Sequence, residues 1–250
     1  MNEIPPKPVT DIWRPELVRL PKLTRARHAF RAFGQGLAKL VVKIFLNVSA
    51  EGLENLADIR NAGPLLITIN HLGDADVPTL FSILPSPPDA LAEIELYDLP
   101  VLGKLIEWYG VIWLHRGRAD KRALRAALDA LAEGRALVIA PEGRYSLTGA
   151  LEEGGGGAAF LAVKSGAAIL PIVITGTENE KTYGNLKQLR RARVHIKAGK
   201  MFRLSGQAQG GVGSEANDRR AALAEGTRQI MEALAILLPE EYRGAYSSKT

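Results

Sequence analysis

The chain has 250 residues, of which 46% are hydrophobic, and it carries a formal net charge of +5. This length and apolar content are typical of one sizeable α/β domain or two small ones, and they exclude a chain that is disordered throughout. The sequence contains no cysteine, which excludes disulfide bonds, thiolate nucleophiles and cysteine-ligated metal sites. Four scattered histidines without a His-Glu-x-x-His pattern give no support to another kind of metal site.

The positive charge is concentrated in the first 50 residues. Nine Lys and Arg residues stand there against three acidic residues, a balance of +6, so the other 200 residues sum to −1. This asymmetry indicates that the N-terminal segment meets an anionic surface. No apolar run approaches the roughly 20 residues of a membrane-spanning helix, and the first residues lack the order of a secretory signal. We therefore expect neither a membrane span nor export.

Residues 24–46 are expected to form an amphipathic helix. The apolar stripe contains Phe30, Phe33, Leu37, Leu40, Val41 and Ile44. The opposite, basic face contains Arg27, Arg31, Lys39 and Lys43, with Gln35 among them. Two interpretations stay open: the helix lies in a membrane interface beside anionic lipid, or its Phe residues pack on the main domain. Because the aromatic residues are not interleaved with the basic ones, we expect no nucleic-acid partner. We divide the chain into a membrane-interface arm, residues 1–50, and a main domain, residues 51–250.

The main domain alternates short apolar runs with longer helical stretches. The expected strands are 64–70, 111–114, 136–140, 168–176 and 193–199. The expected helices are 75–85, 99–109, 119–133, 157–166 and 215–238. This order predicts an α/β fold with a mostly parallel sheet that is covered by helices on both faces. Functional groups in such a sheet collect at the strand ends.

A histidine and an aspartate follow the first of these strands. His71 comes directly after residues 64–70, and Asp76 stands five positions later at the start of a predicted helix. A carboxylate that binds one imidazole nitrogen fixes the tautomer, and the other nitrogen can then act as a general base near neutral pH. The alternative is that Asp74 or Asp76 only caps the helix while His71 satisfies a turn.

Polar residues follow three further strands. Arg116 comes after residues 111–114 and is able to hold a phosphate. Glu142, Gly143 and Arg144 come after residues 136–140, where the glycine permits a close backbone approach to a ligand. Pro171, within residues 168–176, predicts an irregular or edge position. Taken singly, solvated arginines and ordinary turn chemistry also explain these residues.

In this order the stretches resemble the glycerolipid acyltransferase family, which contains the 1-acylglycerol-3-phosphate acyltransferases. The family's Asn-His-x4-Asp block is matched by Asn70, His71 and Asp76. Its second block, Gly-x-(Ile/Val)-(Phe/Trp)-(Ile/Val/Leu)-Asp-Arg, is matched over residues 110–116, with His115 at the usual aspartate. Its Phe-Pro-Glu-Gly-Thr-Arg-Ser block corresponds to residues 140–146, and its Val-Pro-(Val/Ile) strand to residues 170–172. The similarity covers about residues 50–205.

The resemblance implies a sheet of the glycerol-3-phosphate acyltransferase type and a role for each matching residue. His71 would take the proton from the acceptor hydroxyl as it attacks the thioester of acyl-CoA or acyl-carrier protein, and Asp76 would orient the ring. The acceptor would be bound by Arg116, Glu142, Gly143 and Arg144.

The resemblance further implies transfer of a fatty acyl group to 1-acylglycerol 3-phosphate, giving phosphatidic acid. Because the chain has no cysteine and no Gly-x-Ser-x-Gly elbow, we expect direct transfer without a covalent acyl-enzyme. No cofactor is expected besides the thioester co-substrate. The expected partners are a lysophospholipid and an anionic membrane surface, with the enzyme peripheral on the cytoplasmic face. Alternatives are another acceptor, water included, or a lipid-surface binding protein without turnover.

Two departures from the family pattern concern the acceptor phosphate. Tyr145 stands where the third block usually has its arginine, and Ile94 stands where many members have a lysine. Arg144, Arg118 and Lys104 are possible substitutes for the missing cations.

Overall fold

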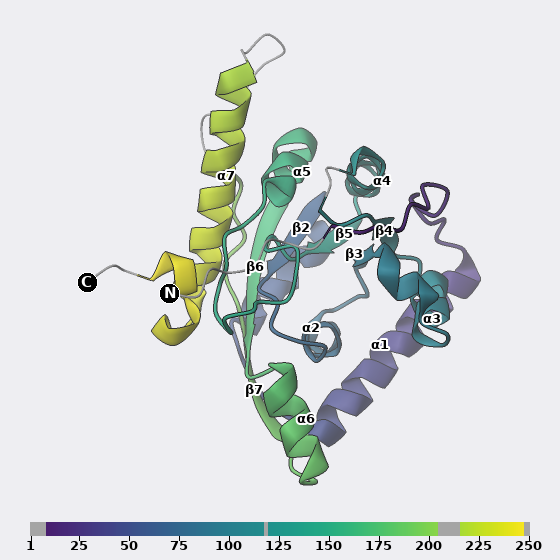
Figure 1. Ribbon diagram of the computed structural model, residues 1–250, viewed down its shortest axis with the longest axis vertical. Helices are drawn as coiled ribbons and strands as arrows, with labels where there is room; N and C mark the ends of the chain where they lie inside the picture. Colours follow the sequence, from purple (N-terminus) through teal and green to yellow (C-terminus); the bar gives the residue numbers. More distant parts are fainter. Residues whose placement is uncertain (1–8, 118–119, 205–215, 248–250) are drawn as a thin grey trace.

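The structure is a computed structural model and describes residues 9–117, 120–204 and 216–247. Its α-helices, labelled in Figure 1, are α1 (Arg25–Phe45), α2 (Asp76–Ile83), α3 (Leu102–Tyr109), α4 (Lys121–Ala132), α5 (Gly157–Ser165), α6 (Asn179–Lys187) and α7 (Ala216–Leu237). Short 3₁₀ helices span Leu53–Asn61, Ile94–Asp98, Glu240–Tyr242 and Gly244–Tyr246. Every expected helix is present, although the first residues of two expected ranges, 119 and 215, lie outside the described residues.

The strands form one seven-stranded sheet within the described residues, in the order β1-β7-β6-β2-β5-β3-β4. Their bounds are β1 (Leu46–Glu51), β2 (Leu65–Ile69), β3 (Asp89–Glu93), β4 (Ile112–Leu114), β5 (Ala136–Ile139), β6 (Ala168–Thr175) and β7 (Ala192–Ala198). All neighbours pair in parallel except β6 and β7. The expected mostly parallel sheet is therefore confirmed, and β2, β3, β4, β5 and β6 all end at one edge.

Helices cover both faces of this sheet. Side chains of one face, such as Leu66 and Ile169, pack with α4, α5 and α7. Side chains of the other face, such as Ile67 and Leu170, pack with α1 and α2. All five residues of β2 are buried, which explains why its sequence is continuously apolar instead of alternating. Figure 1 shows α5 and α7 on one side of the sheet and α1 and α2 on the other.

The helix α1 packs on the domain through its polar side, in contrast to the interpretation in which its Phe residues pack there. Arg31 is only 3% exposed, and Gln35 and Val42 are buried with it. Phe33 is 67% exposed and Ile44 is 52% exposed. The apolar stripe of α1 thus faces outward.

Hydrogen bonding explains this orientation. Arg31 Nη2 donates to Asp89 Oδ1 at 2.6 Å, and the Asp89 carboxylate is itself 1% exposed. Gln35 Nε2 donates to the carbonyl oxygens of Phe81 and Leu84 at the end of α2. A buried carboxylate and open helix carbonyls need donors, and these two side chains supply them. The helical projection placed Arg31 on a basic face open to lipid. In the structure Arg31 is instead buried against the domain.

Three elements were not expected from the sequence: β1, β3 and α6. The strand β1 follows α1 directly and pairs with β7, so the expected boundary between residues 50 and 51 falls inside β1. Residues 46–50 of the expected arm thus form an edge strand of the sheet. The helix α6 buries none of its residues, so it lacks the apolar stripe by which helices are found in a sequence.

Of the two positions predicted for Pro171, irregular or edge, the edge position is wrong, because β6 has a neighbour on each side. The last ladder pair with β7 is Ile172 with Ala198. Beyond it, Gly199 donates its N–H to the Pro171 carbonyl at 2.8 Å. Pro171 is tolerated because its missing N–H falls where the pairing with β7 ends.

Candidate active site

The expected site residues collect at the edge where the parallel strands end. His71 follows β2, Glu142 follows β5, and Arg116 follows β4. Between them, β3 ends at Glu93. The sheet order β2-β5-β3-β4 therefore places these four residues on neighbouring strand ends.

His71 and Asp76 form the hydrogen bond that the sequence predicted. Nδ1 of His71 lies 2.8 Å from Oδ2 of Asp76, whose side chain is fully buried. The same oxygen accepts the backbone N–H groups of Leu72 at 2.7 Å and Gly73 at 2.9 Å. With an acceptor at Nδ1, the neutral ring carries its proton there and leaves Nε2 as the acceptor. Among the described residues, nothing hydrogen-bonds Nε2, and the side chain is 21% exposed.

The turn that carries His71 is tied to the end of β6. Asn70 donates to the Ile174 carbonyl and accepts the Ile174 N–H, both at 2.8 Å, as a backbone group would. A Cβ on Gly73 would stand 2.3 Å from the carbonyl oxygen of Thr177, so only glycine fits this position. These contacts fix the direction in which the imidazole points.

Glu142, which the family resemblance assigns to the acceptor, accepts two backbone N–H groups. It is fully buried, its Oε1 accepts the N–H of His71 at 3.1 Å, and its Oε2 accepts the N–H of Glu152 at 2.8 Å. Gly143 follows in the left-handed region, with φ 69°, which permits the tight turn after β5. Glu142 thus positions the turn of His71, and this contact was not visible in the sequence.

Arg144 is held in a buried ion pair. Its Nη2 lies 2.7 Å from Oε2 of Glu152, and the two side chains are 8% and 4% exposed. The other Glu152 oxygen accepts the N–H of Leu147 at 2.8 Å. This ion pair stabilises the loop after β5 and directs the Arg144 guanidinium to Glu152.

Arg116, which follows β4, contacts two carboxylates at the end of β3 and just beyond it. Nη1 lies 2.6 Å from Glu93, and Nη2 lies 3.8 Å from Glu95. Burial raises the pKa of Glu93 above its ordinary value, against the opposing effect of the Arg116 charge. Nε of Arg116 is buried and has no partner among the described residues, so one donor remains for a ligand.

The structure describes two of the three other positions at which a cation was considered. Ile94 is fully buried in the core, so a lysine replacing it in the same backbone position would meet apolar side chains. Lys104 is exposed on α3. Arg118 lies outside the described residues.

Tyr145 packs against the candidate base. The rings of Tyr145 and His71 lie 4.2 Å apart at 61°, an edge arrangement. The Tyr145 hydroxyl donates to Asp74 at 2.8 Å, and the Tyr183 hydroxyl of α6 donates to the other Asp74 oxygen at 2.7 Å. Burial, together with the bond to Asp74, raises the pKa of Tyr145, so the phenol stays protonated. Tyr183 could not be identified from the sequence as a residue of this site, since α6 itself was not expected.

This arrangement supports proton abstraction at Nε2 from a hydroxyl group near the strand ends. Within residues 9–117, 120–204 and 216–247, no three His, Asp or Glu side chains gather as the ligands of a metal ion would.

A family model described as "Acyltransferase" matches residues 47–175, more than half of the chain. The chain is 28% identical over 179 residues to the chloroplastic 1-acyl-sn-glycerol-3-phosphate acyltransferase LPAT1 of Arabidopsis thaliana, covering 66% of this chain and 49% of the relative. It is 31% identical over 113 residues to the lyso-ornithine lipid O-acyltransferase of Pseudomonas aeruginosa, covering 45% of this chain and 43% of the relative. The chain thus spans less than half the length of these two relatives.

The fold also matches a solved structure. The crystal structure of the 1-acyl-sn-glycerophosphate acyltransferase PlsC from Thermotoga maritima superposes with a TM-score of 0.55 and 24% identity, covering 84% of this chain and 83% of that one. This similarity shows the fold, and it agrees with the expected sheet of the glycerol-3-phosphate acyltransferase type.

Proposed function

The chain belongs to the acyltransferase family, and we propose that it acylates the free hydroxyl of 1-acylglycerol 3-phosphate in phospholipid biosynthesis. The donor is a fatty acyl thioester of coenzyme A or of acyl-carrier protein, and the product is phosphatidic acid. The name of the Arabidopsis relative supports this acceptor.

The observation that carries the proposal is the hydrogen bond between His71 Nδ1 and Asp76 Oδ2 at 2.8 Å, with Nε2 left available. Nε2 takes the proton of the acceptor hydroxyl while the hydroxyl oxygen attacks the thioester carbonyl. The tetrahedral intermediate then collapses to the ester, and the departing thiolate receives the proton from the imidazolium. The buried Asp76 carboxylate stabilises the imidazolium between these two proton transfers.

The same mechanism implies direct transfer between the two substrates. No covalent acyl-enzyme forms and no cofactor takes part, because the base acts on the acceptor hydroxyl itself. The thioester serves as a co-substrate.

The outward face of α1 supports a peripheral site on the cytoplasmic side of a membrane. Phe33, Leu37, Leu40 and Ile44 are each between 48% and 67% exposed, and Lys43 is exposed beside them. The apolar surface continues onto α3, where Trp108 is 68% exposed and packs against Phe30 at 5.8 Å between ring centroids. An apolar helix face flanked by lysine is suited to the interface of an anionic bilayer, in which a lysophospholipid resides. None of the described helices is long and apolar enough to span a bilayer.

A second candidate is transfer to a lysolipid without a phosphate monoester. Arg144 and Arg116 both contact carboxylates, at 2.7 Å and 2.6 Å, and Tyr145 stands where the family usually has an arginine. The Pseudomonas relative is named for such an acceptor, lyso-ornithine lipid.

One experiment separates these candidates. Free thiol release from palmitoyl-CoA is measured with 1-acylglycerol 3-phosphate, with lyso-ornithine lipid, and with no acceptor, and the lipid products are identified by mass. Release that requires 1-acylglycerol 3-phosphate and yields phosphatidic acid supports the leading proposal. Release only with lyso-ornithine lipid supports the second candidate, and release without any acceptor indicates a thioesterase. A carrier-protein donor is tested in parallel. If palmitoyl-CoA alone gives no thiol release, the second donor distinguishes an inactive protein from a wrong choice of donor.

A further inference from the structure

The loop between α6 and β7 carries an unusual concentration of positive charge. We call residues 186–193, with the sequence LKQLRRAR, the basic loop. The range includes the last two residues of α6 and the first two residues of β7. It contains four cations and no acidic residue. Within the described part of the chain, none of Lys187, Arg190 and Arg193 forms an ion pair with a carboxylate, and all three are exposed. Their charge is therefore directed to solvent or to a ligand.

The basic loop also exposes two leucines. Leu189 is 94% exposed and Leu186 is 43% exposed. Leu189 has φ 53°, the one positive φ of a non-glycine residue among the described residues. The left-handed region is unfavourable for leucine, and Leu189 gains no burial in the monomer in return. The positive φ closes the end of α6, where the N–H groups of Leu189 and Arg190 bond the carbonyls of Leu186 and Asn185, and it leaves the Leu189 side chain facing outward.

A hollow beside the loop is lined by cations. The cavity has a volume of about 410 Å³, and its lining includes Lys181, Arg190, Arg191, Arg193, Gly176 and Asn185. Lys181 is paired with Glu178 at 2.7 Å, and the arginines supply the remaining charge. The Arg191 guanidinium donates to the Leu46 carbonyl, so Arg190 and Arg193 are the arginines of this lining that remain for phosphate oxygens.

The basic loop lies at the same edge of the sheet as His71. Since β6 runs parallel to β2 and ends at Thr175, the antiparallel β7 begins at Ala192 on that edge. Arg191 Nε donates to the Leu46 carbonyl at 2.8 Å, which joins the loop to the residue that caps α1. Figure 1 shows α6 and the carboxyl end of α1 converging at the bottom of the molecule. The basic loop therefore lies beside the carboxyl end of α1, where Val41, Ile44 and Phe45 are exposed.

We propose that the basic loop is a second membrane contact, in which Leu186 and Leu189 enter the interface while Lys187, Arg190 and Arg193 bind the phosphates of anionic lipids. This inference rests on the membrane association in the proposed function. A bilayer is favoured over an acidic carrier protein as the occupant, because the loop presents leucines and cations together and lies beside the carboxyl end of α1. With α1 as one contact and the loop as the other, the edge that carries His71 is oriented toward the lipid.

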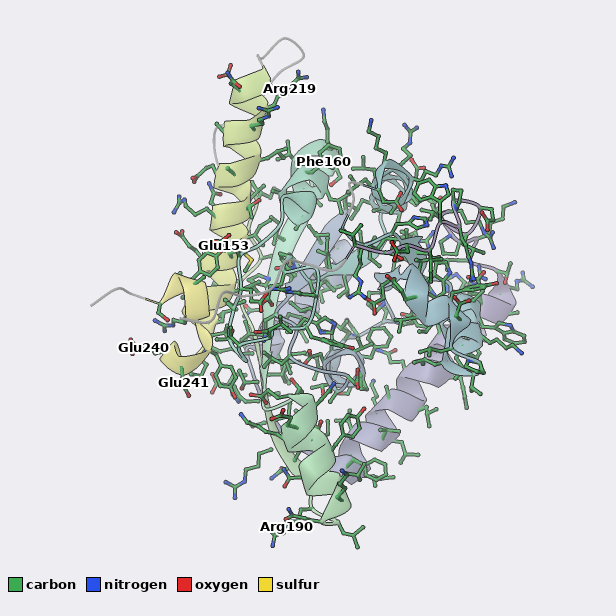
Figure 2. The ribbon with its side chains drawn as sticks, in the orientation of Figure 1. Glu153, Phe160, Arg190, Arg219, Glu240 and Glu241 are labelled. Atoms are coloured by element: carbon green, nitrogen blue, oxygen red, sulfur yellow. The ribbon has the colours of Figure 1, made fainter. Side chains whose placement is uncertain are left out.

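The first test neutralises the loop. The double variant Arg190→Gln, Arg193→Gln is mixed with phosphatidylcholine vesicles that contain phosphatidylglycerol, and binding is measured by cosedimentation. We expect binding to weaken about 30-fold, and binding to pure phosphatidylcholine vesicles to change little. The matched control, Arg219→Gln with Arg220→Gln, removes the same charge from the far end of α7 and should bind like the wild type. Figure 2 shows Arg190 and Arg219 at opposite ends of the molecule.

The second test separates membrane contact from a structural role of Leu189. Leu189→Gly relieves the positive φ and removes the apolar side chain, so we expect unchanged or higher thermal stability together with several-fold weaker vesicle binding. Vesicle binding equal to that of the wild type in this variant would contradict the insertion of Leu189.

The outcomes also distinguish this inference from the proposed function. If the wild type binds no vesicles, both the proposed membrane association and the loop contact are refuted. A wild type that binds while the double variant binds equally well overturns the loop contact alone. Equal vesicle binding with lost turnover on a carrier-protein donor would assign the loop to that acidic protein and overturn the proposal. Turnover of a short-chain, monomeric lysolipid with an acyl-CoA donor should be the same in the double variant and the wild type.

Discussion

The protein contains two His-x4-Asp turns with the same internal geometry and different surroundings. His71 follows β2 and bonds Asp76 at the start of α2, with Nδ1 2.8 Å from the carboxylate. His115 follows β4 and bonds Asp120, the N-cap of α4, with Nδ1 2.6 Å from the carboxylate. Asp76 also accepts the N–H groups of Leu72 and Gly73 within the turn, whereas Asp120 accepts those of Arg122 and Ala123 at the start of α4.

The difference lies at the other ring nitrogen. Nε2 of His115 accepts the backbone N–H of Arg14 at 3.0 Å, and the Trp13 ring lies 4.6 Å from the imidazole. His115 is 1% exposed, whereas the side chain of His71 is 21% exposed and its Nε2 is not hydrogen-bonded within the described residues. The spacing therefore fixes a tautomer in both turns. At His115 the Arg14 N–H takes Nε2 and makes the ring an anchor, whereas at His71 Nε2 is left for the proposed role of general base.

The largest expected effect follows from removing the available base. His71→Ala should lower thiol release by about 10²–10⁴-fold, the usual contribution of a general base. Since the side chain is partly exposed, the melting temperature should change little. Acceptor-dependent turnover and thermal unfolding are measured on the same preparation. Turnover at the wild-type rate would remove His71 from the mechanism.

His115→Ala should give the opposite result. The change leaves the Arg14 N–H and the Asp120 carboxylate without their imidazole partner and opens a cavity, so we expect about 2–4 kcal/mol of destabilisation. For a chain of this size each kcal/mol corresponds to roughly 2–4 °C in melting temperature. Turnover at a temperature where the variant is folded should stay close to that of the wild type. A loss as large as that of His71→Ala would break the comparison.

Asp120→Asn tests the anchor through its pH dependence. Burial alone would raise the pKa of Asp120, but hydrogen bonds from His115 and from the start of α4 outweigh it and lower the pKa below 3.8. A lowered folded pKa contributes stability above the unfolded pKa, and this contribution is lost as the pH falls through the folded value. We expect Asp120→Asn to cost about 1–2 kcal/mol at neutral pH from the lost hydrogen bonds. Denaturant titrations should show the two curves converging below pH 3.8, and a constant difference would contradict this origin.

The smallest expected effect concerns Trp13, which covers His115. Its side chain is 60% exposed, so Trp13→Ala should cost only about 0.5–1.5 kcal/mol, the usual contribution of a ring pair. Turnover should not change. A combined Trp13 and His115 variant should lose less stability than the sum of the single changes, because both remove the same contact.

Local spacing made part of this site predictable. His71 and Asp76 lie within one turn, and the strand before them is continuously apolar, so their hydrogen bond could be expected from the sequence. The partners of Arg144 and Arg116 could not be predicted from the sequence. Glu152 meets Arg144 only through the fold of the loop after β5, and Glu93 meets Arg116 only because β3 and β4 are neighbours in the sheet.

The helix α1 shows a second limit. The helical period correctly grouped its residues into an apolar and a polar face, but not which face turns inward. That choice depends on Asp89, a buried carboxylate far along the chain that takes Arg31 as its donor. The strands β1 and β3 escaped prediction because their sequences, LNVSAE and DALAE, lack the run of β-branched residues that marked β6.

The most direct test of the central claim measures the accessibility of the two Nε2 atoms. The chain has four histidines, so a variant with His28→Gln and His195→Gln retains only His71 and His115. This variant is treated with diethyl pyrocarbonate, which acylates available imidazole nitrogens, and the modified residues are located by mass spectrometry while thiol release is followed. We predict that His71 is modified in proportion to the loss of turnover and that His115 reacts only after unfolding. Modification of native His115, or full turnover with His71 modified, would contradict the assignment of base and anchor.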